Sequence, residues 1–396
     1  MTGGGLDDAR RARVWLARTV EPGSAAVIEY VERLGPQEAA HRIRCGAAPD
    51  AIRSLAAARS AEDRVDRDLE IAHRHGIRTL FPEDPDWPAY PLLPMDVATA
   101  RGVPDLAAPL MLWLRGAGRT VELTERAVAV VGSRAATAYG THVATDLAYH
   151  LSEQGWSVVS GGAYGIDAAA HRGALSGSTP TIAVIAGGLD LPYPAGNRRL
   201  FDRLADTGLL VSEWPPGCAP QRHRFLVRNR LIAGLTAGTV VVEAGRRSGA
   251  KQTARRAREL GRPVMVVPGP VTSAMSVGSH DLARDGARLV TCAADVLAEV
   301  GPLGAGLDGC RDPSAGVPLD TLDDTTRQVL DGVPVRRAAP VERIARAAGV
   351  PARTVLRSLP VLEAAGFVES TNGEWRLAPQ PRASGGAVLP THPQGG

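Results

Sequence analysis

The chain has 396 residues, of which 44% are hydrophobic and 22% charged, and its formal net charge is +3. This length allows two or three domains of roughly 100–200 residues, and the composition is that of an ordinary globular protein. No apolar run approaches the roughly 20 residues that span a bilayer, and the N-terminal residues contain no signal-peptide core. We therefore expect a cytoplasmic protein without membrane association.

The cysteines point to the same compartment. The four of them are scattered, with no CxxC pair and no zinc-ligand spacing, so we expect structural thiols and no metal site. They are Cys45, Cys218, Cys292 and Cys310. The basic residues are almost all arginine, since Lys251 is the only lysine. Arginine forks suit phosphate groups, although a GC-rich genome explains much of this composition.

Residues 1–95 are predicted to form a small helical domain of the helix-hairpin-helix or SAM-like kind. Ala, Leu and Arg dominate from about Asp7 to Asp68, with breaks at Glu21-Pro22-Gly23 and at Gly35-Pro36. A short strand is expected at Gly76–Leu80.

Residues 105–300 are predicted to form an extended Rossmann-like α/β domain with a parallel sheet. Short apolar, β-branched runs alternate here with helical stretches, as in βαβ units whose strands are covered on both faces. The expected strands are Val128–Val131, Ser157–Val159, Ile182–Ala186, Leu209–Val211, Val240–Val242, Val264–Val267 and Arg288–Val290.

The C-terminal part is predicted to contain a linker (301–320), a winged helix-turn-helix domain (321–378) and a disordered tail (379–396). Helices are expected at Asp324–Asp331, Val341–Ala348 and Ala352–Ala365, followed by a hairpin around Asn372-Gly373. Pro360 should kink or shorten the third helix. Whether this domain binds DNA or protein therefore stays open.

The ends of the predicted strands carry groups suited to anions, because ligands of open α/β sheets bind beyond the carboxyl ends of the strands. Ser133 and Arg134 follow the first strand, and a cradle of Ser160, Gly161, Gly162 and Gly165 follows the second. Asp167 and His171 come next, and we expect them, together with Glu243 at a later strand end, to orient the loops.

The densest basic segment is Arg222–Arg230, where arginines surround a single aromatic residue. Such a segment suits single-stranded nucleic acid, since cations follow the backbone and a ring stacks on a base. The later segment Ser248-Gly249-Ala250-Lys251-Gln252-Thr253 departs from a Walker A loop at Ala250 and Gln252, and the dinucleotide fingerprint is absent after the first strand. We expect no cofactor and no catalytic residues.

Taken in order, these loops resemble the DprA/Smf family of DNA-processing proteins. The resemblance rests on Val131-Gly132-Ser133-Arg134, the Ser160–Asp167 loop with His171, Gly188-Leu189-Asp190 with Tyr193-Pro194, Phe225-x-x-Arg228-Asn229-Arg230, Val242-Glu243-Ala244 with Ser248-Gly249, and Val267-Pro268-Gly269. It implies a non-catalytic protein that binds and protects incoming single-stranded DNA, forms a homodimer and helps load a RecA-type recombinase in transformation and recombination.

The resemblance also implies the residues that contact DNA. They are Ser133, Arg134, Ser160, Gly161, Gly162, Gly165, Phe225, Arg228, Asn229, Arg230 and Ser248. Two departures from the family pattern matter: Leu226 stands where a proline is usual, and Ala250-Lys251 replaces a Ser-Leu pair. Lys251 is therefore a further candidate DNA contact that the family does not imply.

Two other functions compete with this one. A phosphoribohydrolase acting on nucleoside monophosphates is a related Rossmann enzyme, but its Pro-Gly-Gly-x-Gly-Thr loop is missing. A duplex-DNA regulator would use Arg353 and Arg357 of the winged helix, against which Pro360 argues.

Overall fold

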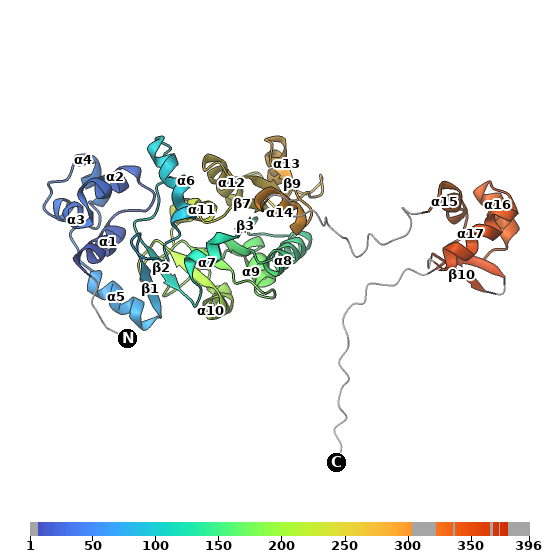
Figure 1. Ribbon diagram of the computed structural model, residues 1–396, viewed down its shortest axis with the longest axis horizontal. Helices are drawn as coiled ribbons and strands as arrows, with labels where there is room; N and C mark the ends of the chain where they lie inside the picture. The colour runs from blue at the N-terminus through green and yellow to red at the C-terminus, as the bar shows by residue number, and fades with distance from the viewer. Residues whose placement is uncertain (1–6, 303–321, 336, 365–366, 372, 379–396) are drawn as a thin grey trace, which may run out of the picture. The chain divides into compact units, whose positions relative to one another are not determined.

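The computed structural model describes residues 7–302, 322–335, 337–364, 367–371 and 373–378 (Figure 1). The chain divides into two compact units, Met1–Cys310 and Arg311–Gly396, each of which is described by itself. Most of the predicted linker, the predicted tail, Cys310 and Asn372 lie outside the described residues.

The first unit is built on a nine-stranded sheet with the order β1-β2-β6-β5-β4-β3-β7-β8-β9. The seven strands from β6 to β9 in this order are parallel, while β1 and β2 join one edge antiparallel. The predicted parallel α/β fold is confirmed. The strands are β1 (Ile77–Leu80), β2 (Leu112–Arg115), β3 (Ala127–Val131), β4 (Ser157–Ser160), β5 (Ile182–Ile185), β6 (Leu209–Ser212), β7 (Gly238–Val241), β8 (Val264–Val266) and β9 (Arg288–Leu289).

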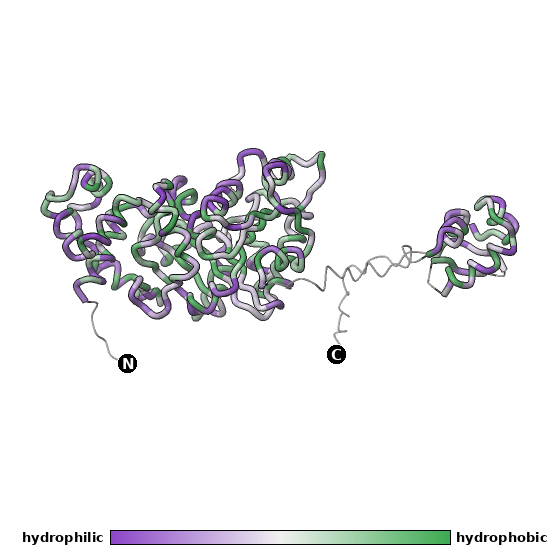
Figure 2. The backbone as a smooth tube through the Cα atoms, turned by 45° about the horizontal axis from the view of Figure 1, so that its top comes forward, coloured by the Kyte–Doolittle hydropathy of each residue, from purple (hydrophilic) through white to green (hydrophobic). Residues whose placement is uncertain are grey.

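Alternate residues of each central strand face opposite layers of helices. In β3, Ala127 and Ala129 belong to a core with α6 (Ala89–Ala100), α11 (Arg222–Gly234), α12 (Gly249–Glu259) and α13 (Val277–Arg284). Val128 and Val130 belong to a core with α8 (Ala138–Glu153), α9 (Ile166–Ala174) and α14 (Ala293–Val300). Figure 1 shows these two layers on either side of the strands, and Figure 2 shows hydrophilic residues along the outer turns of the helices.

The N-terminal helices share a core with the sheet. Trp15 of α1 lies in one hydrophobic cluster with Trp113 of β2 and with Phe201 of α10 (Arg198–Thr207). Because β1 already pairs with β2, the boundary that we expected at residue 95 falls inside the α/β unit. The helices of this region are α1 (Asp8–Thr19), α2 (Ala25–Leu34), α3 (Pro36–Arg44), α4 (Asp50–Ala56) and α5 (Val65–Arg74).

The second unit contains α15 (Asp324–Asp331), α16 (Val341–Ala348), α17 (Ala352–Ala364) and the hairpin β10 (Val368–Thr371) and β11 (Glu374–Leu377). Val329, Ile344, Val355 and Leu359 form its core. The helix α17 continues through Pro360 to Ala364, so this proline does not end the helix, and the expected alternative of a kink stays a prediction. The order of three helices and a hairpin agrees with a winged helix, and that assignment stays a prediction.

Two further findings concern the cysteines and the membrane. Cys45 and Cys218 are free thiols, whereas Cys292 is disulfide-bonded, so the expectation of thiols throughout is wrong for Cys292. Within the described ranges, no helix has the length and apolar character needed to cross a membrane.

Candidate nucleic-acid interface

A large open cleft lies at the carboxyl ends of the central strands. The chain runs outward from β3 through β4, β5 and β6, and then returns to place β7 on the other side of β3. Ligands of open α/β sheets bind at such a reversal of strand order. The cleft has a volume of about 1580 Å³, and the loop after β3, the helix α11 and the start of α12 line it.

Seven of the twelve predicted DNA contacts line this cleft. They are Ser133, Arg134, Phe225, Arg228, Asn229, Ser248 and Lys251. The other five, which do not line it, are Ser160, Gly161, Gly162, Gly165 and Arg230. The structure thus brings together the loops after β3 and β7 with α11, whereas the loop after β4 contributes Ala163 to the lining of the cleft.

The cleft is strongly basic. Eight basic side chains line it, against the two carboxylates of Asp167 and Asp285. Four of the eight make no hydrogen bond or ion pair with the described residues, so their donors are available to an anion. These four are Arg134, Arg222, Arg246 and Arg247, and the others are Arg228, Lys251, Arg255 and Arg258.

Sequence reasoning missed four of these residues. Arg246 and Arg247 were not singled out, although they follow β7 directly, and the β7 loop lies beside the β3 loop. Arg255 and Arg258, which lie on α12, were not singled out either. Their spacing from Lys251, four and then three residues, was the available signal, since it places all three on one face of a helix.

Glu243 orders the loop that carries Ser133 and Arg134. Its carboxylate accepts hydrogen bonds from the backbone N–H of Thr137 at 3.0 Å and from the Thr137 hydroxyl at 2.5 Å. Thr137 in turn caps the start of α8 by accepting from the Gly140 N–H at 3.1 Å. Any side chain at Gly140 would collide with Glu243, because an added Cβ would lie 2.3 Å from its carboxylate. These are the contacts that the expected loop-orienting role of Glu243 requires.

Phe225 lies half-buried among cations at the floor of the cleft. The Arg134 guanidinium carbon lies 4.8 Å from the centre of its ring, and that of Arg228 lies 5.9 Å away. On another side Tyr193 meets it edge to face, with the ring centres 6.0 Å apart. The arrangement keeps an aromatic ring and cations together at one place in the cleft.

The glycine-rich loop after β4 is not an open anion cradle. Its Ala163 N–H donates to the Asp167 carboxylate at 3.3 Å, and the Gly161 N–H also lies close enough to lower the pKa of Asp167, which burial raises. This internal carboxylate stands where a phosphate was expected. The Ala163 and Gly161 amides are thus already engaged, and direct contact of this loop with DNA stays a prediction.

Close packing explains the glycines and the serine of that loop. An added Cβ would lie 2.4 Å from Arg228 at Gly161, 2.6 Å from Phe201 at Gly162 and 2.2 Å from the Ser133 carbonyl at Gly165. The Ser160 hydroxyl is buried and donates to the Val130 carbonyl at 2.7 Å. The three glycines and Ser160 therefore allow the loop to pack closely against its neighbours, among them Arg228 and Ser133 of the cleft.

Arg228 and Asn229 line the cleft, and their side chains also donate hydrogen bonds to backbone carbonyls of neighbouring segments. Arg228 donates to the Gly161 carbonyl at 2.7 Å and to the Val184 carbonyl. Burial lowers the pKa of Arg228 to about 10, with Arg134 acting in the same direction and Asp167 opposing both. Arg228 therefore remains a cation near neutral pH. The Asn229 amide donates to the Gly249 carbonyl at 3.4 Å, at the start of α12.

Arg230 lies in the interior rather than in the cleft. Its side chain is fully buried and donates to Glu213 at 2.5 Å. It also packs against Gly23, where an added Cβ would lie 2.9 Å from its Nε. Arg230 is thus not exposed in this structure, and its predicted contact with DNA stays a prediction.

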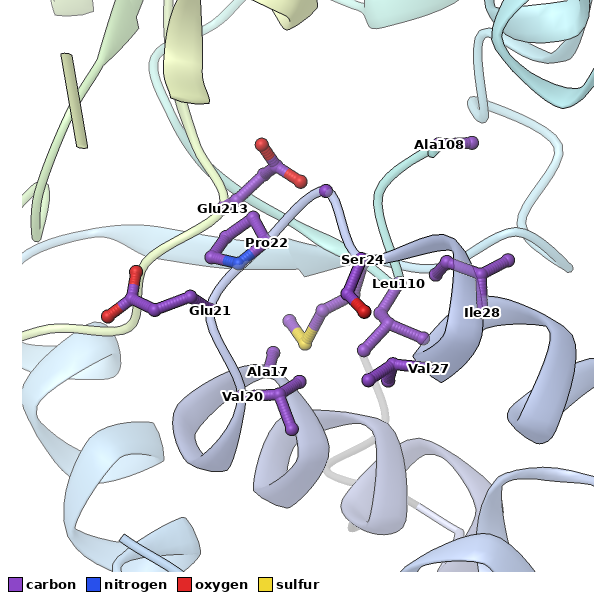
Figure 3. A pocket seen from close by; sticks show the side chains of 12 residues that line it. Ala17, Val20, Glu21, Pro22, Ser24, Val27, Ile28, Ala108, Leu110 and Glu213 are labelled. Atoms are coloured by element: carbon purple, nitrogen blue, oxygen red, sulfur yellow. The ribbon is translucent and has the colours of Figure 1, made fainter. Parts of the chain in front are cut away.

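Glu213 borders a second, much smaller pocket of about 20 Å³ (Figure 3). Figure 3 shows its carboxylate close to Pro22 and to the chain that carries Glu21. This volume suffices for about one water molecule, so the pocket belongs to the packing of the N-terminal segment.

Ser248 and Lys251 mark the start of α12. The Ser248 hydroxyl accepts from the Ala250 N–H at 3.3 Å as the N-cap of this helix. Lys251 pairs with Asp281 of α13 at 3.0 Å, and this bond lowers the pKa of Asp281. A phosphate that bound Lys251 would compete with Asp281.

His171 lies deep behind the cleft. Its Nδ1 lies 2.9 Å from the Thr181 hydroxyl, which donates to the Val158 carbonyl, so His171 donates to Thr181 as a neutral ring. Burial lowers the pKa of His171 to about 3, and Arg228 and Arg172 act in the same direction. His171 therefore has a structural role, as a buried and neutral hydrogen-bond donor. Among the described residues, no group of three or more His, Cys, Asp or Glu side chains is placed to hold a metal ion.

Comparison with known proteins gives the family. The family model described as DNA recombination-mediator protein A matches residues 78–301. The chain is 48% identical over 387 residues to a putative DNA processing protein DprA of Mycobacterium tuberculosis, covering 97% of this chain and 99% of that protein. It is 44% identical over 192 residues to the DNA processing protein DprA of Streptococcus pneumoniae, which is 48% of this chain and 67% of that protein.

A solved structure agrees with this result. The X-ray structure of DNA processing protein A from Streptococcus pneumoniae matches with a TM-score of 0.61 and 31% sequence identity, covering 75% of this chain and 99% of that one. The chain therefore belongs to the DNA recombination-mediator protein A family, to which the DprA proteins belong.

Proposed function

We propose that the chain acts in DNA processing and recombination, and that its cleft binds single-stranded DNA. One observation carries the proposal: eight basic side chains line a single cleft, and two of them, Arg134 and Arg228, lie over the ring of Phe225. Cations that follow a backbone beside a ring that can stack on a base are the combination found in single-strand binders. The relatives named as DNA processing proteins support the same role.

We propose that the protein binds DNA without transforming it. The Asp167 carboxylate, which borders the cleft, bonds to the loop after β4 instead of standing free as an acid or base. Loading of a RecA-type recombinase and formation of a homodimer remain part of the proposal. The family's description as a recombination mediator supports the first of these.

A gel-shift titration with single- and double-stranded oligonucleotides at two salt concentrations tests the DNA proposal. We expect tighter binding to the single strand, and an affinity that falls steeply with salt because bound phosphates release counterions. Equal binding to both forms, or no binding to either, would contradict the proposal. Incubation of the purified protein with AMP tests the absence of catalysis, since release of free adenine would show a phosphoribohydrolase.

A further inference from the structure

The cleft has two chemically different sides, set by the order of the strands. Tyr193 follows β5, whereas Arg246 and Arg247 follow β7. In the sheet β5 and β7 are separated by β4 and β3, so three inter-strand spacings lie between them. At about 4.8 Å each, these spacings amount to roughly 14 Å. Both groups nevertheless line the same cleft.

The side next to β5 carries the exposed apolar and aromatic groups of the cleft, and Arg134 and Arg228 lie beside them at the ring of Phe225. Tyr193 and Leu226 are each 48% exposed, and both line the cleft with Phe225. Leu191 extends this surface beside Tyr193 and Phe225 and is 74% exposed. Exposed apolar groups gathered in a cleft indicate a ligand with an apolar face.

The side next to β7 is basic. Arg246 and Arg247 are exposed and make no hydrogen bond or ion pair with the described residues. Lys251, Arg255 and Arg258 lie on one face of α12, where Lys251 is paired with Asp281 and Arg255 with Glu259. Asp285 is the acidic residue that lines this side.

We propose that a single strand lies along this cleft with its bases turned toward Tyr193 and Leu226 and its phosphates toward Arg246 and Arg247. The inference rests on the proposed function and deepens it. A single strand has one face of exposed bases and one of phosphates, which matches the two sides of the cleft. In a duplex the bases are paired and stacked inside, so their faces would not reach Tyr193.

Two probes separate the two sides: an oligothymidylate and an abasic oligonucleotide of the same length. Both carry the same phosphates, and only the first carries bases. Tyr193→Ala is expected to weaken binding of the oligothymidylate about tenfold, the size of one lost stacking contact, and to leave binding of the abasic probe unchanged. Leu226→Ser, a change of an exposed side chain, is expected to act in the same direction.

Replacing the two arginines should act on both probes. The double variant Arg246→Ala/Arg247→Ala is expected to weaken binding of each and to reduce the salt slope by about 1.4, or roughly 0.7 per lost phosphate contact. Arg67→Ala/Arg74→Ala serves as the matched control, because it removes two exposed charges from α5, outside the cleft. Tyr90→Ala is the matched control for the lost tyrosine, since Tyr90 is 87% exposed on α6.

The outcomes distinguish this inference from the proposed function. The inference is overturned if Tyr193→Ala and Leu226→Ser weaken both probes equally or neither, or if the arginine variant affects only the oligothymidylate. If the unaltered protein binds neither probe, the proposed function itself fails. Circular dichroism on each variant confirms that it is folded before binding is compared.

Discussion

Arg230 and Glu213 form an ion pair in the interior, with 2.5 Å between the guanidinium Nη2 and the carboxylate Oε1. The pair joins α11, which carries Phe225 and Arg228 into the cleft, to the end of β6. Burial raises the pKa of Glu213, and Arg230 opposes this rise through its charge and its hydrogen bond. Arg230 therefore holds the helix of the cleft in place from behind.

Removing one partner of this pair should destabilise the protein. Arg230→Ala leaves the Glu213 carboxylate buried without its counter-charge, a change that costs about 3–5 kcal/mol in unfolding free energy. The double variant Arg230→Met/Glu213→Leu should recover much of the loss, because it removes both charges. Urea denaturation measures both effects. A folded double variant that bound single-stranded DNA much more weakly than the unaltered protein would support Arg230 as a DNA contact.

Arg134 should contribute directly to DNA affinity. Its guanidinium is exposed, and its one described contact is with the ring of Phe225, so Arg134→Ala should fold normally. We expect binding of single-stranded DNA to weaken about tenfold, as for one lost charge-assisted hydrogen bond. The salt slope should fall by about 0.7. Fluorescence anisotropy measures both quantities, and an unchanged affinity would remove Arg134 from the interface.

Gly165 should tolerate no side chain. Its φ is +75°, and an added Cβ would lie 2.2 Å from the Ser133 carbonyl oxygen, which accepts a hydrogen bond from Ile166. Gly165→Ala is therefore expected to lower the unfolding free energy by about 1–3 kcal/mol and to displace the loop of Arg134.

Gly155→Ala is the control for this experiment. Gly155 has a similar φ of +77°, but nothing lies within 4 Å of its added Cβ. Both variants place a side chain at a positive φ. The difference between their losses of unfolding free energy therefore measures the collision with the Ser133 carbonyl alone. Equal losses of stability would show that the collision is relieved without cost.

Glu21 should make stability depend on acidic pH. Burial raises the pKa of Glu21, but hydrogen bonds from Arg224, Trp214 and Arg59 outweigh burial and lower it to about 2, from 4.5 in the unfolded chain. A carboxylate with a lowered pKa stabilises the fold above its unfolded pKa, and this stabilisation is lost as pH falls toward its folded pKa. The loss should therefore occur between pH 4.5 and about 2.

Thermal unfolding of the Glu21→Gln variant measures this contribution. The variant should be less stable than the unaltered protein at pH 7, and the two should converge as pH falls through that window. A constant difference across the window would mean that the ionisation of Glu21 does not contribute. Because Arg224 belongs to α11, DNA binding measured at pH 7 also shows whether Glu21 positions that helix.

The sequence alone determined the α/β fold of the first unit. Apolar β-branched runs alternating with helices predicted all seven parallel strands. Six of them, β3 to β8, are buried on both faces, and such burial produces a continuous apolar run in the sequence. The strand-end residues Ser133, Arg134 and Ser248 were found for the same reason, since the carboxyl ends of parallel strands meet at one edge. The antiparallel addition of β1 and β2 was not found, because pairing between distant segments leaves no local signal.

Tertiary structure alone decided which groups of those loops line the cleft. Arg228 and Arg230 are two residues apart in one helix, yet one lines the cleft and the other is buried against Gly23 and Glu213. The Gly161 and Ala163 amides, suited to a phosphate by sequence, are directed to Asp167 instead. Arg246 and Arg247 became candidates because they line the cleft and make no hydrogen bond or ion pair with the described residues. In each case the decisive contact joins groups placed together by folding, which a local pattern does not encode.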